Sequence, residues 1–495
     1  MKIQQFLEHH GIASNPFADE DAQTDLVFKG ACIRTVFHPT WDKIYGDPTE
    51  PATSVVFGEK GSGKTALGLQ IVRCLSDYNA DHPDRQVFVV QYDDFNPFLD
   101  RFRDRFSGRR RRVDRVLGQW RLWDHMDAVL SMAVTQLVDR ILEVRQARHP
   151  AARDEPLPVE SLDRSQARDV LLLAACYDQS TAENRFQRWN RVRKKLRFRT
   201  WQTWWDQGVG IAVTLAVLAL FAWLAPKWLL TPWPYAAIAA GWVPRAWRLL
   251  KSYGRAWQVA RNARVLNHNT SLLLRTLIRI PAAQLVGQPL PASQRTDDRY
   301  ELLAKLQGVL RTLRFDGILI LVDRVDEPYL VNGSTELMQA LVWPMLDNKF
   351  LKHPGMGLKL LLPIELERLL DRQDRDFHQR ARLDKQNLVR SLAWTGQSLY
   401  DVANARLKAC AADGRSPVLA DLLDPAIGAP RLKEALGTLR VPRHLFKFLF
   451  RLITTHCNAY SDEAPAWRIP VGAFESVLAI YQRDQDALDR GVGAG

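Results

Sequence analysis

The eight residues at positions 58–65 limit the fold of this chain more than any other stretch. They read Gly-Glu-Lys-Gly-Ser-Gly-Lys-Thr and fit the pattern G-x-x-x-x-G-K-[ST] at every specified position. A short run rich in β-branched and aromatic residues precedes them at 54–57, and apolar residues at helical spacing follow at 66–75. Strand, loop and helix in this order are the context of a phosphate-binding P-loop, which is our interpretation. The alternative is a chance glycine-rich turn.

Each part of a P-loop has its own task in binding a nucleotide. The glycines let successive backbone N–H groups and the positive end of the following helix face an anionic phosphate. Lys64 is predicted to reach the β- and γ-phosphates and the Thr65 hydroxyl to ligate Mg²⁺, so ATP and Mg²⁺ are the expected cofactors. The predicted nucleotide-binding residues of this stretch are Gly58, Glu59, Lys60, Gly61, Ser62, Gly63, Lys64, Thr65 and Ala66.

A second motif supplies the carboxylate that a magnesium nucleotide needs. Residues 318–322 form a continuous apolar run, typical of a central parallel strand buried on both faces, and Asp-Arg-Val-Asp-Glu follows at 323–327. In open α/β sheets ligands bind at the carboxyl ends of strands. Asp323 is therefore predicted to lie beside Lys64 and Thr65 and to be a magnesium ligand.

The same motif offers two candidates for the base that activates the attacking water. Glu327 is favoured and Asp326 is second, so Lys64, Asp326 and Glu327 form the predicted catalytic set. In the alternative interpretation, Asp326 and Glu327 only cap the next helix.

The positive charge of the chain is concentrated in one segment. Between Arg185 and Arg264 there are 15 Lys or Arg and one acidic residue, a balance of +14 in a chain whose total is +13. The rest of the chain is thus nearly neutral, which argues against a nucleic-acid partner, since such binding requires neutralising phosphates. Five scattered cysteines without C-x-x-C spacing indicate neither a zinc site nor a disulfide framework.

Two uncharged stretches lie inside this basic segment, over 207–226 and 228–244. Their lengths of 20 and 17 residues are close to the roughly 17–20 apolar residues that a helix needs to cross a bilayer. Ten of the 16 tryptophans fall between Trp189 and Trp257, as in an aromatic belt. We therefore predict a transmembrane hairpin that contacts lipid through residues 207–244. The alternative is a buried helical hairpin in a soluble protein.

Basic residues flank both stretches, so the positive-inside rule predicts that both ends of the hairpin face the cytoplasm. The expected location is the inner, cytoplasmic membrane, with the nucleotide-binding core in the cytoplasm. The flanking basic residues are Arg191, Arg193, Lys194, Lys195, Arg197 and Arg199 before the hairpin, and Arg245, Arg248, Lys251 and Arg255 after it.

The fold class predicted for the whole chain is α/β: a P-loop parallel sheet with helices on both faces. Further strands are predicted at 86–92 and 358–363, and helices at 122–144, 165–177, 261–280 and 300–313. The expected regions are an N-terminal lead-in over 1–52, the first part of the nucleotide-binding core over 53–104, a helical insertion over 105–185, the basic-flanked hairpin over 186–265, the second part of the core over 266–380 and a helical C-terminal lid over 381–495.

Together the two motifs resemble those of the signal-transducing STAND branch of P-loop ATPases. Asp-x-x-Asp-Glu at 323–327 is similar to the Walker B motif of NACHT-type members, although Arg324 stands where KAP members have a second acid. A membrane hairpin inserted between the two motifs resembles the KAP family. Pro442-Arg443 resembles a sensor-2 element, which implies that Arg443 touches the γ-phosphate. No polar sensor residue is evident at 358–363, where related ATPases often carry one.

The resemblance implies a membrane-tethered ATPase that acts as a nucleotide-dependent switch, in bacterial antiphage defence or signalling. A protein partner or a second copy of the chain would read the switch. The alternative is a soluble, DNA-associated ATPase of the origin-recognition or transposition-helper kind, which the charge distribution disfavours. A small-molecule kinase is a weaker hypothesis, because no acceptor site is recognisable.

Overall fold

The computed structural model describes residues 1–144, 156–199, 204–224, 231–412 and 414–489. Its centre is a five-stranded sheet in the order β2-β3-β4-β1-β5, in which every paired strand is parallel. The predicted α/β class is confirmed. The strands are β1 (Ser54–Gly58), β2 (Gln86–Tyr92), β3 (Phe315–Val322), β4 (Met356–Pro363) and β5 (Asn387–Val389).

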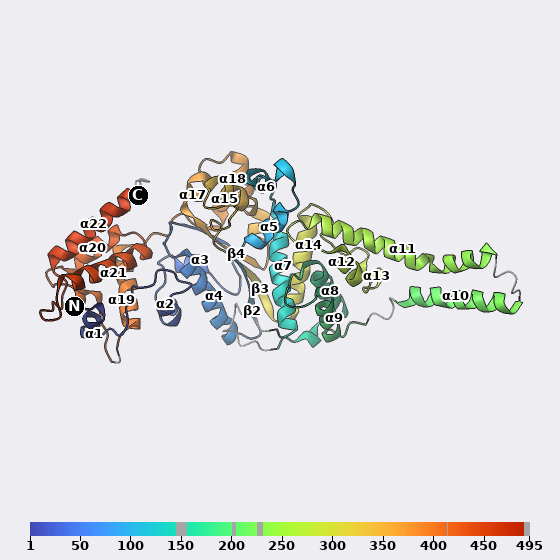
Figure 1. Ribbon diagram of the computed structural model, residues 1–495, viewed down its shortest axis with the longest axis horizontal. Coiled ribbons are helices and arrows are strands. Elements are labelled where there is room, and N and C mark those ends of the chain that lie inside the picture. Colours follow the sequence, from blue (N-terminus) through green and yellow to red (C-terminus); the bar gives the residue numbers. More distant parts are fainter. Residues whose placement is uncertain (145–155, 200–203, 225–230, 413, 490–495) are drawn as a thin grey trace.

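Helices cover both faces of this sheet (Figure 1). On one face, α4 (Lys64–Asp81) buries Leu67, Ile71 and Leu75 against alternate residues of β1, β3 and β4. On the other face, α7 (Leu122–Ile141) and α14 (Asp297–Thr312) join the main hydrophobic core with residues of β2 and β3. The alternating burial of strand residues toward two cores explains why the strands are apolar throughout.

The remaining helices group around these layers (Figure 1). Those between the P-loop and β3 are α5 (Asn96–Arg103), α6 (Val113–Leu117), α8 (Arg164–Tyr177), α9 (Arg185–Lys195), α12 (Thr270–Leu277) and α13 (Ala282–Leu285). Those after β3 are α15 (Thr335–Val342), α16 (Asn348–Leu351), α17 (Ile364–Leu370), α18 (Arg375–Ala381), α19 (Gly396–Ala409), α20 (Ala429–Thr438), α21 (Pro442–Ala459) and α22 (Val471–Asp489).

The helices of the insertion belong to the main core. Asp127 on α7 and Arg299 on α14 form a fully buried ion pair at 3.0 Å, and the Tyr177 hydroxyl of α8 donates to Asp127 at 2.8 Å. Removing one partner of such a pair leaves an uncompensated buried charge, which costs about 3–5 kcal/mol. These helices are therefore fixed to the sheet domain.

The N-terminal segment packs mainly against the C-terminal helices. Its helices are α1 (Ile3–His9), α2 (Leu26–Gly30) and α3 (Trp41–Tyr45). Phe6 and Leu7 of α1 lie in a second hydrophobic core with α19 to α22, whereas Ile44 of α3 packs with the sheet. The segment thus bridges the C-terminal helices and the sheet instead of wrapping the sheet domain alone.

The fully buried Lys359 on β4 connects the N-terminal segment to the sheet. Its Nζ donates to the carbonyl oxygens of Ile44 (2.6 Å), Tyr45 (3.0 Å) and Ala52 (2.8 Å). Burial lowers the pKa of Lys359 to about 7. The Lys359 side chain thus donates to three carbonyl oxygens, of which Ile44 O also accepts from Ser54 Oγ at 2.8 Å.

Replacing Lys359 with Ala is expected to lower the free energy of unfolding by about 2–5 kcal/mol, because it leaves buried carbonyl oxygens unpaired and opens a cavity. Lys352→Ala, at an exposed position just before β4, is the matched control and should change it by no more than about 0.5 kcal/mol. The measurement is the midpoint of urea unfolding followed by tryptophan fluorescence. Equal midpoints for the two variants would contradict the role given to Lys359.

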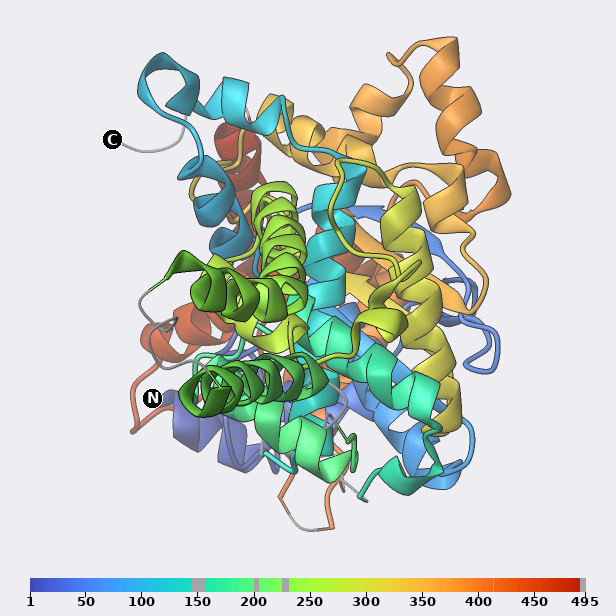
Figure 2. The same cartoon turned by 90° about the vertical axis from the view of Figure 1, so that its right-hand side faces the viewer.

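A long helical hairpin projects from the end of the body opposite the C-terminal helices (Figure 1). It consists of α10 (Trp205–Leu224) and α11 (Pro232–Asn262). Figure 2, seen from the hairpin side, shows both helices standing out in front of the body. Only the second half of α11 is anchored, since Ser252, Ala256 and Val259 are buried against the body.

Small residues hold the two hairpin helices together. A Cβ on Gly210 would lie 2.8 Å from the ring of Trp242, and one on Gly241 would lie 2.7 Å from Cγ1 of Val213. Trp242 Nε1 also donates to Thr214 Oγ1 at 3.1 Å. Small residues that let two helix backbones approach closely are typical of helix–helix interfaces in membrane proteins.

The outer faces of the hairpin are apolar and exposed. Trp223, for example, is 84% exposed. Exposed patches of this kind mark surfaces that bind a partner or a membrane. The exposed large apolar residues of this region are Trp204, Trp205, Val209, Ile211, Leu215, Leu218, Leu220, Trp223, Trp233, Tyr235, Val243, Trp247 and Leu250.

The two predicted transmembrane spans are not seen. Among the described residues, no helix has both the length and the apolar character needed to cross a membrane. The apolar part of α11 starts only at Pro232 and ends before Arg245, which is shorter than the about 17 residues required. Residues 225–230, part of the prediction, lie outside the described residues.

Two predicted helix boundaries were also wrong. α11 continues through Pro244 to Asn262, although proline usually ends or bends a helix. The helix predicted over 261–280 is interrupted, because Asn269 caps a new helix by accepting a hydrogen bond from the Ser271 N–H at 3.0 Å. The other predicted helices and strands lie where expected, to within a few residues.

Candidate functional site

The loop between β1 and α4 has the backbone geometry of an anion cradle. Gly61 and Gly63 have φ values of +88° and +94°, a region that residues with a side chain rarely adopt. A Cβ on Gly58 would lie 2.4 Å from Ser62 Oγ, so this position also requires glycine. The loop ends at Lys64, where α4 begins, and a phosphate here would meet the positive end of that helix.

Lys64 folds back over this loop. Its Nζ donates to the carbonyl oxygens of Gly58 (2.8 Å) and Glu59 (3.0 Å). Burial lowers the pKa of Lys64, while the carboxylates of Asp323 and other acids act in the opposite direction. The buried Ser62 Oγ has no hydrogen-bond partner among the described residues. A donor of this kind inside the cradle fits a phosphate group.

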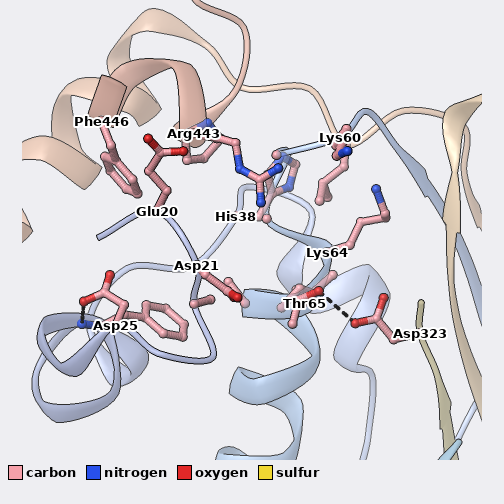
Figure 3. Close-up of a pocket in the computed structure, with 18 of the residues that line it drawn as sticks. Glu20, Asp21, Asp25, His38, Lys60, Lys64, Thr65, Asp323, Arg443 and Phe446 are labelled. Carbon is pink, nitrogen blue, oxygen red and sulfur yellow. Dashed lines mark hydrogen bonds between the residues drawn. The ribbon is translucent and has the colours of Figure 1, made fainter. Parts of the chain in front are cut away.

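The two sequence motifs meet in one hydrogen bond. Thr65 Oγ1 donates to Asp323 Oδ2 at 2.9 Å (Figure 3), although the residues are 258 positions apart. They meet because β4 lies between β1 and β3 with all three carboxyl ends at the same edge. Asp323 is only 7% exposed, and burial raises the pKa of its carboxyl group.

A hydroxyl and a carboxylate in contact are the donor set that fits Mg²⁺ in a nucleotide site. Among the described residues no group of three or more His, Cys, Asp or Glu could hold a metal ion. Mg²⁺ does not need three or more such side chains, because it is usually bound by one or two protein groups together with substrate phosphates and water. Thr65 and Asp323 would therefore be the protein's contribution.

Asp326 and Glu327 both line the cavity at this edge, but their surroundings differ. The charge of Asp326 acts on Lys64, whereas Glu327 is 59% exposed and pairs with Arg324 at 3.5 Å. Neither residue caps a helix, since Ser334 caps α15 and accepts the N–H of Leu337 at 3.5 Å. The helix-capping alternative does not hold.

Arg443, far along the chain, lies directly against the P-loop. The N-terminus of α21 approaches Gly61 so closely that a Cβ there would lie 2.7 Å from Arg443 Cβ, and the Arg443 N–H donates to Gly61 O at 3.4 Å. Figure 3 shows its side chain on the same side of the cavity as Lys60. Arg443 and both carboxylates thus line the same cavity as Lys64, Thr65 and Asp323.

Several residues that the sequence did not point to also shape this site. Trp394 Nε1 donates to Ser62 O at 2.8 Å, and its ring meets the ring of His38 edge-on at 4.7 Å. His38 Nε2 is 2.9 Å from the Ala393 carbonyl, and burial lowers its pKa. Glu365 lines the cavity just after β4, the strand in which no polar sensor residue was evident from the sequence.

The cavity beyond the P-loop has a volume of about 400 Å³ and reaches the N-terminal segment and the C-terminal helices. Arg406 joins these two walls: its guanidinium contacts Asp25 at 2.5 Å and the Pro16 carbonyl at 2.6 Å. Phe446 and Glu20 line the same end (Figure 3). The size suits a small ligand held between two parts of the protein.

Comparisons of the chain with protein-family models, with curated proteins and with solved structures found no match. The interpretation of the site therefore rests on its own geometry.

Replacing Gly61 with Ala is expected to weaken ATP binding by at least about tenfold, because the new Cβ would force the P-loop and Arg443 apart and strain the backbone. Gly414→Ala is the control, since Gly414 has a similar φ of +75° but nothing within 4 Å of the added atom. Titration with a fluorescent ATP analogue measures both. Similar losses of affinity in the two variants would show that the contact with Arg443 is unimportant.

Proposed function

We propose that this chain is a Mg²⁺-dependent ATPase that acts as a nucleotide-dependent molecular switch on a membrane. The observation that carries the proposal is the hydrogen bond between Thr65 and Asp323, which joins the Mg²⁺-binding residue types of two separate motifs. The glycine cradle and Lys64 support it, because they are suited to a polyphosphate.

The residues of the chain would divide the work of hydrolysis. When bound, ATP and Mg²⁺ supply the bond to be broken and neutralise charge on the phosphates. Lys64 Nζ would leave its carbonyl acceptors for phosphate oxygens, and the loop N–H groups would hold these oxygens in place. Glu327, or Asp326 in its place, would accept a proton from the attacking water.

The position of the cavity supports a switch. The cavity is lined by the P-loop and by Arg443 and Phe446 of α21, so a bound nucleotide would touch both. A ligand changes the balance between two arrangements only if it binds one of them better. The γ-phosphate near Arg443 would supply this difference. A protein partner or a second copy of the chain would respond to it.

The hairpin supports a location at the cytoplasmic face of a membrane. Its exposed apolar side chains would enter the lipid, and the basic residues at its root would face anionic headgroups. The resemblance to KAP-type ATPases extends the proposal to bacterial antiphage defence or signalling.

The magnesium dependence of ATP binding tests the proposal. In Asp323→Asn we expect the strengthening of ATP binding by Mg²⁺ to fall by at least about tenfold, because the carboxylate that acts with Thr65 is lost. Asp316→Asn, exposed at the other end of the same strand, should bind like the unaltered protein. Equal magnesium dependence in both variants would remove the basis of the proposal.

A further inference from the structure

Two hydrogen-bond donors from the C-terminal part of the chain hold the P-loop from outside. Trp394, which directly precedes the N-cap residue of α19, donates its indole N–H to the Ser62 carbonyl oxygen at 2.8 Å. The backbone N–H of Arg443, in the first turn of α21, donates to the Gly61 carbonyl oxygen at 3.4 Å. Two successive carbonyl groups of the loop thus accept from donors that flank the C-terminal helices.

The bond from the indole fixes the direction of one peptide group in the loop. In a trans peptide the C=O and the following N–H point in opposite directions, and no peptide bond among the described residues is cis. Because the indole N–H holds the Ser62 carbonyl on its side, the Gly63 N–H points away from Trp394. Within the described part of the chain this N–H has no acceptor, and Gly63 lines the nucleotide cavity. It is therefore available to a phosphate oxygen.

The loop itself does little to fix these peptide groups. Gly61 and Gly63 have φ values of +88° and +94°, and glycine adopts negative φ as readily, so neither residue resists rotation of the peptides beside it. Inside the loop, Glu59 O accepts from the Ser62 N–H at 3.1 Å and from Lys64 Nζ at 3.0 Å. The carbonyl groups of Gly61 and Ser62 are left to the two donors outside.

Trp394 lies where the sheet domain joins the C-terminal helices. Two residues before it, the Leu392 N–H donates to the Phe57 carbonyl of β1 at 2.8 Å. Two residues after it, Gly396 packs so closely on α20 that a Cβ would clash with the Lys433 carbonyl. The Trp394 side chain also packs against the core of the C-terminal helices. A change in the position of these helices would therefore act on the indole and, through it, on the P-loop.

We propose that Trp394 is a positioning residue for the phosphates, and that the C-terminal helices set the phosphate affinity of the P-loop through its indole and through the Arg443 N–H. This role rests on the proposed function only in that it needs a polyphosphate in the loop. It is separate from any contact of the Arg443 side chain with a γ-phosphate. By linkage, helices that strengthen phosphate binding are themselves held more firmly once phosphate is bound.

The test removes the indole N–H and keeps an aromatic ring. Trp394→Phe retains a ring beside His38, whose own ring lies 4.7 Å away, but loses the donor to Ser62. Trp343→Phe is the matched control, since the buried Trp343 Nε1 makes no hydrogen bond within the described residues. Calorimetry of the purified full chain with tripolyphosphate and Mg²⁺ measures phosphate binding without a base. We expect about three- to tenfold weaker binding in Trp394→Phe than in Trp343→Phe, the size of one hydrogen bond.

Hydrogen exchange provides a second readout of the same contact. In the unaltered protein, tripolyphosphate should slow amide exchange both at 58–65 and at 392–398, because the two segments hold each other. In Trp394→Phe the slowing at 392–398 should be lost, while an unchanged melting temperature shows that the variant is folded. Equal affinity of the two variants for tripolyphosphate, or no change of exchange at 392–398 in the unaltered protein, would overturn the proposal.

Steady-state kinetics separate this role from the proposed ATPase activity. The indole would act on bound ATP before and during hydrolysis alike, so Trp394→Phe should raise KM for MgATP by a similar factor and leave kcat nearly unchanged. No hydrolysis by the unaltered protein, together with the expected loss of tripolyphosphate affinity, would reject the ATPase and support the role of Trp394. A lower kcat at unchanged KM, or no binding of tripolyphosphate by the unaltered protein, would overturn that role.

Discussion

Glu327→Gln is expected to lower the rate of ATP hydrolysis by about 10²- to 10⁴-fold, the usual contribution of a positioned general base. ATP binding should remain, because the amide keeps the size of the side chain and Glu327 does not contact the P-loop residues that hold phosphate. A salt bridge of 3.5 Å to Arg324 places the Glu327 carboxylate at the edge of the site in the structure without nucleotide. Single-turnover hydrolysis and analogue titration separate the two effects.

Asp326→Asn is the matched control for this substitution, since it removes a neighbouring carboxylate that faces Lys64. If Glu327 is the base, Asp326→Asn should retain most of the hydrolysis rate. A normal rate in Glu327→Gln together with a large loss in Asp326→Asn would assign the base to Asp326. The comparison is necessary because Glu327 is 59% exposed while Asp326 also lines the cavity.

Deleting residues 201–250 is expected to move the protein from the membrane fraction to the soluble fraction. The deletion removes the exposed apolar faces of α10 and α11 but keeps Ser252, Ala256 and Val259, which anchor α11 to the body. Nucleotide binding should persist, because α2 and α21, which contribute residues to the P-loop cavity, lie at the end of the body away from the hairpin (Figure 1). High-speed sedimentation without detergent measures the distribution.

A pair of substitutions separates lipid contact from a general effect of exposed apolar residues. Leu215→Asp, in the middle of α10, should release a large share of the protein, since an acidic residue at the centre of an apolar span costs about 2.5–3.5 kcal/mol on insertion scales. Leu26→Asp, at a position that is 78% exposed on the nucleotide side, should not. Recovery of the intact, unaltered protein in the supernatant would contradict membrane contact altogether.

The parts of the fold and site that were predictable from the sequence are those specified by neighbouring residues. The P-loop, the β-strands and Asp323 follow from short patterns, and the meeting of Thr65 with Asp323 follows from the rule for carboxyl ends of parallel strands. Trp394 and His38 could not be found in this way. They reach the P-loop only because β5 and the N-terminal segment fold back on the sheet, and neither stands in a motif.

The hairpin shows a different limit. Its helices were predictable from composition, but where α11 ends depends on packing: Ala256 and Val259 are buried by α12 and the body, so the helix continues past Pro244 into a charged stretch. The position of α1 in the core of the C-terminal helices depends on contacts between the two ends of the chain. Single-sequence periodicity carries no information about such contacts.

The most direct test of the central claim is the release of phosphate from ATP by the purified chain, with and without Mg²⁺, compared with Lys64→Ala. We expect hydrolysis that requires Mg²⁺ and that falls by at least about 10²-fold in Lys64→Ala, because the substitution removes the cation that would hold the phosphates. Hydrolysis at the same rate in Lys64→Ala, or no release of phosphate by the unaltered protein under any Mg²⁺ concentration, would contradict it.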